Sequence, residues 1–71
     1  MQHVANRKRA ERVEDALGDS EHYNIYVVGV SESAQDLLTD LRHFCDKHGL
    51  DFAELDRKAH NHYKAELKDP E

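Results

Sequence analysis

The most regular pattern of apolar and polar side chains lies between residues 33 and 48. The apolar positions recur every three or four residues and fall within a sector about 120° wide on a helical wheel. They are Ala34, Leu37, Leu38, Leu41, Phe44, Cys45 and His48. Ser33 and Asp36 stand three residues apart at the start, as the partners of a capping box do. The pattern predicts a helix over residues 33–48 that ends at Gly49, a residue suited to a left-handed C-cap.

A second helical pattern follows after a very short connection. Asp51 is a suitable N-cap, and Glu54 stands three residues later. The apolar face of this helix, predicted over residues 51–67, consists of Phe52, Leu55, Ala59, Tyr63 and Leu67. Such a short connection makes consecutive helices neighbours, so we expect a helical hairpin. Its predicted core is Leu38, Leu41, Phe44, Phe52, Leu55 and Tyr63.

The N-terminal segment, residues 1–18, carries a thinner apolar stripe. Ala10, Val13 and Leu17 follow helical spacing, and Gly18 supplies a stop signal. We therefore predict a helix from about Val4 to Leu17. The apolar stripe of this helix is too narrow to form the centre of a core. We expect it to pack against another element of the chain or against the same helix of a second copy.

Residues 23–30 interrupt the helical pattern with β-branched and aromatic side chains, which favour extended backbone. We predict a strand here. A lone strand leaves backbone groups unpaired, so we expect it to pair between subunits. The predicted fold is mainly α, a single domain of residues 1–71 with the order helix, short strand, helix, helix, assembled as a homodimer.

Composition narrows the functional classes. The 71 residues fit one small domain with a marginal core, and the single cysteine excludes a disulfide within the chain. A formal net charge of −5 argues against broad binding to nucleic acids or anionic membranes. No apolar run reaches the roughly 18 residues of a membrane span, and no secretory signal pattern is present, so the expected location is the cytoplasm.

Candidate chemistry is sparse. The six histidines form no pair at a spacing of four, and there is no paired-cysteine motif. The remaining metal candidates are His43 and His60, one from each helix of the hairpin. Cys45 lies on the apolar stripe, so we predict that it is a small buried hydrophobic residue. No glycine-rich phosphate loop is present. We expect no cofactor, no metal and no enzymatic activity.

Two clusters are predicted to bind partners. One is the apolar strand, and the other is the basic N-terminal group. Their residues are Tyr23, Ile25, Tyr26, Val27 and Val28 in the first, and Arg7, Lys8, Arg9 and Arg12 in the second. Another protein is the expected partner.

Three resemblances add to this interpretation. The segment Asp36–Glu66, with DLLTDLRHFCD, then GLDF, then HY and E, resembles a family of small uncharacterised proteins of bacteria and their phages, which implies a helical hairpin and a mobile-element origin. The order strand, helix, turn, helix resembles ribbon–helix–helix repressors, which implies a DNA-reading ribbon with Asn24 as base reader. Asp36 and Asp40, one turn apart, are similar to the acidic pairs of all-α nucleotide pyrophosphohydrolases, which would hold Mg²⁺.

The sequence therefore predicts a small non-catalytic protein-interaction or regulatory module. A ribbon–helix–helix-like DNA-binding regulator is the first alternative, and a pyrophosphohydrolase-like protein is the second.

Overall fold

Four helices make up the part of the chain that the computed structural model describes, residues 4–68. They are α1 (Val4–Asp19), α2 (Ile25–Val28), α3 (Val30–His48) and α4 (Phe52–Lys68). The prediction of a mainly α fold is confirmed. The first three residues of the predicted N-terminal segment lie outside the described part of the chain.

The predicted strand over residues 23–30 is wrong: these residues hold the single helical turn α2. The side chain of Asn24 accepts a hydrogen bond from the Tyr26 amide at 2.9 Å, and the Asn24 carbonyl accepts from the Val28 amide at 2.9 Å. The Gly29 amide donates to the Ile25 carbonyl at 3.2 Å. A strand without a neighbour leaves its backbone N–H and C=O groups unpaired, whereas a capped helical turn pairs them locally. The gain from these hydrogen bonds outweighs the β propensity of the side chains.

The start of α3 also differs from the prediction. Gly29, with a φ of 101° that favours glycine, separates α2 from α3, and α3 begins at Val30 rather than at Ser33. The Ser33 amide therefore donates to the Gly29 carbonyl at 3.0 Å as part of the first helical turn. The predicted capping box is absent because Ser33 lies inside the helix and is completely buried.

The turn between α3 and α4 is as predicted. Gly49 is left-handed, with a φ of 67°, and the Leu50 amide donates to the Cys45 carbonyl at 2.8 Å, so the last turn of α3 is capped. The Asp51 side chain accepts a hydrogen bond from the Glu54 amide at 3.3 Å and caps α4.

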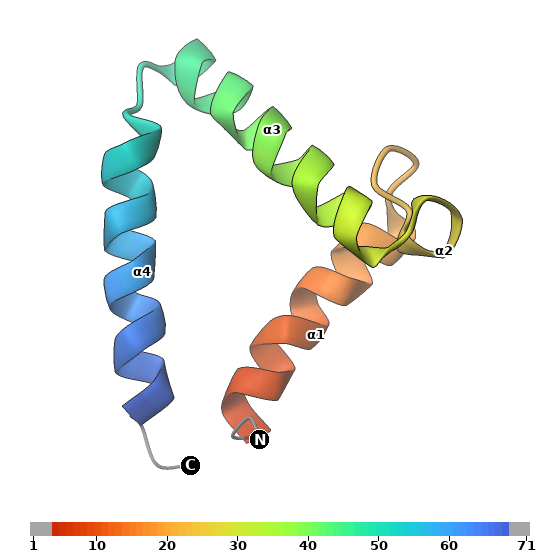
Figure 1. Ribbon diagram of the computed structural model, residues 1–71, viewed down its shortest axis with the longest axis horizontal. Helices are drawn as coiled ribbons and strands as arrows, with labels where there is room; N and C mark the ends of the chain where they lie inside the picture. The colour runs from red at the N-terminus through yellow and green to blue at the C-terminus, as the bar shows by residue number, and fades with distance from the viewer. Residues whose placement is uncertain (1–3, 69–71) are drawn as a thin grey trace.

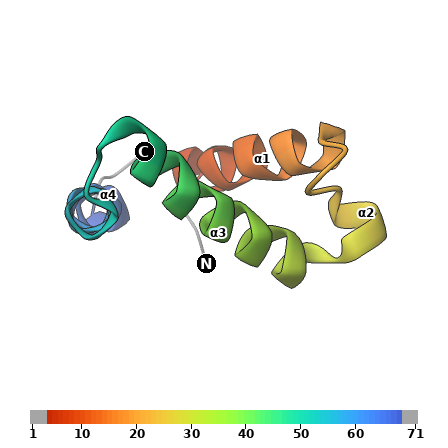
Figure 2. The same cartoon turned by 90° about the horizontal axis from the view of Figure 1, so that it is seen from above.

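The three long helices form an open frame one helix thick (Figure 1). After the Gly49 turn α4 diverges from α3, and its far end returns towards the beginning of α1. Figure 2, with α4 seen end-on, shows how thin the frame is. The molecule measures 36 × 31 × 15 Å, and a helix with side chains is about 10–12 Å across. Domains normally pack two layers around a core, and this chain supplies one.

The open frame leaves a large surface. The accessible surface is 6010 Å², while a folded chain of 8.2 kDa exposes about 4,500 Å². The radius of gyration is 13.8 Å, against about 11 Å for a compact chain of this length. Among the apolar side chains of residues 4–68, only Leu17 and Cys45 are buried, at 5% and 1% exposure. The helices are formed, but one chain does not close a core around them.

Candidate functional site

The inner faces of α3 and α4 line an open hollow of about 210 Å³ beside the Gly49 turn. Its apolar walls come from both helices: Leu38 and Leu41 from α3, with Phe52, Leu55 and Ala59 from α4. We call these five residues the apolar lining. The Arg42 guanidinium, from α3, lies 4.2 Å from the centre of the Phe52 ring. Leu38, Leu41 and Leu55 remain exposed because the helices diverge.

The six predicted core residues do not form a closed core within one chain. Four of them belong to the apolar lining. Phe44 instead lies against His48, with ring centres 4.5 Å apart, and is half exposed. Tyr63 lies further along α4, in a different hollow. The divergence of α3 and α4 keeps the side chains of the two helical faces apart.

A second hollow, of about 420 Å³, lies between α1 and the first half of α3. Val13 and Leu17 line it from α1, and Leu37 lines it from α3. Tyr23 borders it, and its hydroxyl donates to Asp40 Oδ2 at 2.6 Å. That hydrogen bond, with smaller contributions from desolvation and the charges of Asp40 and Asp36, raises the pKa of the Tyr23 phenol above its ordinary value.

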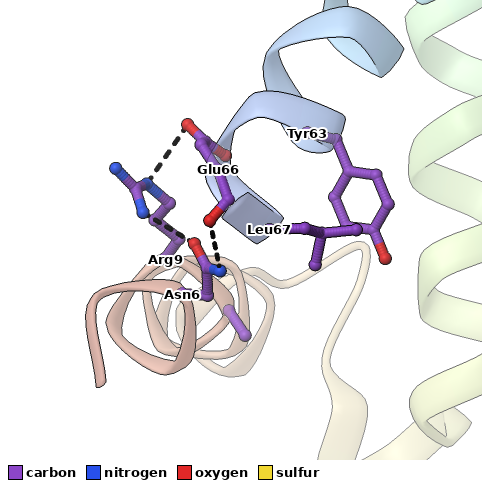
Figure 3. A pocket seen from close by; sticks show the side chains of 6 residues that line it. Asn6, Arg9, Tyr63, Glu66 and Leu67 are labelled. Atoms are coloured by element: carbon purple, nitrogen blue, oxygen red, sulfur yellow. Dashed lines mark hydrogen bonds and ion pairs between the residues drawn. The ribbon is translucent and has the colours of Figure 1, made fainter. Parts of the chain in front are cut away.

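A polar contact closes the frame where α1 and α4 meet (Figure 3). The Asn6 amide nitrogen donates to the Glu66 carbonyl at 3.0 Å, and Arg9 Nη1 donates to Asn6 Oδ1 at 2.7 Å. Arg9 Nε lies 3.3 Å from Glu66 Oε2. We call Asn6, Arg9 and Glu66 the clasp. The contact between Asn6 and Glu66 was not predicted from the sequence, since no local pattern indicates a contact between residues 60 positions apart.

The predicted binding residues of segment 23–30 lie at one corner of the frame. Tyr26 and Val27 are the most exposed large apolar side chains among residues 4–68, at 83% and 82%. Tyr23, Ile25 and Val28 are partly buried. They project from a helical turn and not from a strand.

The basic cluster lies along α1 and is partly engaged by carboxylates. Arg7 Nε lies 3.9 Å from Glu11 Oε1, and Arg9 belongs to the clasp. Arg12 lines the hollow between α1 and α3, and Lys8 is exposed.

The two metal candidates lie on different helices. His43 is exposed on α3, and the His60 ring stacks with Tyr63 at 6.4 Å between centres. Within residues 4–68, no three His, Cys, Asp or Glu side chains gather into a group able to hold a metal ion.

Comparisons with known proteins assign no family. No protein-family model matches the sequence, and no curated protein or solved structure shows significant similarity to it. Of the helices within residues 4–68, none is both long and apolar enough to cross a membrane.

Proposed function

We propose that this protein is a small non-catalytic interaction module, whose apolar lining binds another polypeptide. The observation that carries the proposal is the open hollow between α3 and α4, whose leucines come from two helices and remain exposed. Contiguous exposed apolar surface marks interaction sites in proteins that otherwise expose such residues singly.

The energetics of the single chain support the same proposal. Burial of apolar surface contributes about 25 cal/mol per Å² and is the main favourable term in folding. A frame with two buried apolar side chains among residues 4–68 gains little of this term. A polypeptide seated on the apolar lining would supply the missing burial, so binding and stability are expected to be coupled.

Neither alternative is favoured by a specific observation. A DNA-reading ribbon requires extended backbone at residues 23–30, where the single chain forms α2. Two of the four basic residues, Arg7 and Arg9, already face carboxylates. The pyrophosphohydrolase alternative requires Asp36 and Asp40 to bind Mg²⁺ together. Asp40 instead accepts a hydrogen bond from the Tyr23 hydroxyl, and Asp36 is exposed on α3.

The test compares two variants that add the same charge to α4. Leu55→Glu places a carboxylate in the apolar lining, whereas Asn61→Glu places one at an exposed position on the opposite side of the helix. The tagged parent, incubated with untagged protein and with host lysate, should recover a bound polypeptide, and Asn61→Glu should recover it equally. We expect Leu55→Glu to lose at least about nine tenths of that binding, since a buried unpaired carboxylate is strongly unfavourable. Circular dichroism controls for helix content, and equal recovery by all three proteins would contradict the proposal.

A further inference from the structure

Charge is divided unevenly over the frame. Residues 13–41, which cover the end of α1, all of α2 and the first part of α3, contain no lysine or arginine. They contain seven carboxylates, namely Glu14, Asp15, Asp19, Glu21, Glu32, Asp36 and Asp40. We call this region the acidic corner. It surrounds α2, at the opposite end of the frame from the clasp (Figure 1).

The opposite edge of the frame is basic. It consists of the first part of α1, residues 4–12, and of α4, which the clasp holds together. This basic edge carries eight basic and four acidic side chains, a net charge of +4. The basic members are Arg7, Lys8, Arg9, Arg12, Arg57, Lys58, Lys64 and Lys68. The chain thus carries two surfaces of opposite charge, the acidic corner and the basic edge, at opposite ends of one flat molecule.

The excess surface is of the size that a dimer buries. One chain exposes 6010 Å², about 1,500 Å² more than a compact chain of its mass. Obligate homodimers bury about 2,000–5,000 Å² in total, or about 1,000–2,500 Å² per chain. Two one-layer frames stacked face to face would also make the two-layer arrangement that ordinary domains have.

From these observations we infer that the polypeptide covering the apolar lining is a second copy of this chain, stacked in an antiparallel, two-fold arrangement. The acidic corner of each copy lies over the basic edge of the other. A two-fold axis repeats this favourable contact twice, because each copy offers both surfaces to its partner. A parallel stack would place seven carboxylates over seven carboxylates, and like charges in an interface are strongly unfavourable. This inference rests on the proposed function and names the partner of the same site.

Two charge-reversed variants test the arrangement. The first, Glu32→Lys with Asp36→Lys, makes part of the acidic corner basic, and the second, Lys64→Glu with Lys68→Glu, makes part of the basic edge acidic. All four positions are exposed. Each variant alone then opposes like charges, so its dimer should dissociate with a Kd at least about tenfold higher than the parent's. An equal mixture of the two restores both matched contacts and should dimerise about as tightly as the parent. Asp46→Lys, outside both regions, is the control.

Analytical ultracentrifugation at low salt gives the readout. The expected parent mass is twice the chain mass of 8.2 kDa, with weaker association as salt rises. A dimer whose reversed variants are not restored by mixing would overturn the antiparallel arrangement. A monomer that melts cooperatively at micromolar concentration would show that the partner is not a second copy of the chain. The comparison of Leu55→Glu with Asn61→Glu would then still test whether the apolar lining binds a different protein.

Discussion

The corner where α1, α2 and α3 meet and the arm formed by α4 are built in different ways. In the corner, Leu17 and Ser33 are buried, and the short turn α2 contacts both of its neighbours. In the arm, α4 has no buried residue. The arm is attached by the Gly49 turn, by Arg42 against Phe52, and by the clasp.

This difference shows that a well-capped hairpin does not have to close. The corner is formed by elements joined through short connections, so its contacts require little loop-closure entropy. The caps at Gly49 and Asp51 likewise depend only on local hydrogen bonds. They fix where each helix ends but not the angle between the helix axes. That angle depends on side chains packed between the helices, and within one chain the apolar lining is too open to fix it.

The largest effect should come from the corner. Leu17→Ala removes a side chain that is 5% exposed, and we expect a loss of about 2–5 kcal/mol in the free energy of unfolding. Val13→Ala, one turn earlier and half exposed, is the matched control, with an expected loss of about 1 kcal/mol or less. Urea unfolding at one fixed protein concentration measures both. Equal losses would show that the corner is no better packed than the rest of α1.

A smaller effect should come from the clasp. Asn6→Ala removes a buried amide that donates to Glu66 and accepts from Arg9, so we expect a loss of about 1 kcal/mol. Asn61→Ala, exposed on α4, should change stability by less than about 0.5 kcal/mol. Amide exchange should also accelerate in the last turns of α4 and not in the corner. Acceleration throughout the chain would mean that the arm and the corner unfold together.

The smallest effect concerns Tyr23 and Asp40. Because the hydrogen bond raises the pKa of the Tyr23 phenol in the folded state, its stabilising contribution is complete below the unfolded pKa of about 10. It is lost as the pH rises through the folded value, where the phenolate faces Asp40. The parent should therefore melt slightly above Tyr23→Phe at neutral pH, and this difference should disappear above about pH 10. Thermal melts of the two proteins across that range measure it, and a constant difference would exclude this titration as the cause.

The sequence by itself determined the three long helices and the turn between α3 and α4, but not the start of α3. The apolar spacing of α3 and α4, the left-handed Gly49 and the Asp51 cap are properties of residues within about one turn of one another. The stripe of α1 was predicted for the same reason. Such features are local, because helical hydrogen bonds and caps join residues only a few positions apart.

Segment 23–30 and the arrangement of the helices were decided only by the tertiary structure. β-branched residues favoured a strand, but a strand needs a neighbour, and within residues 4–68 the chain instead forms a turn capped by Asn24 against α1 and α3. The contact between Asn6 and Glu66 spans 60 positions and follows from the divergence of α4, which no local pattern encodes. Four of the six predicted core residues line one hollow and the other two do not. Whether two helical faces meet depends on an angle that the packing of distant side chains sets.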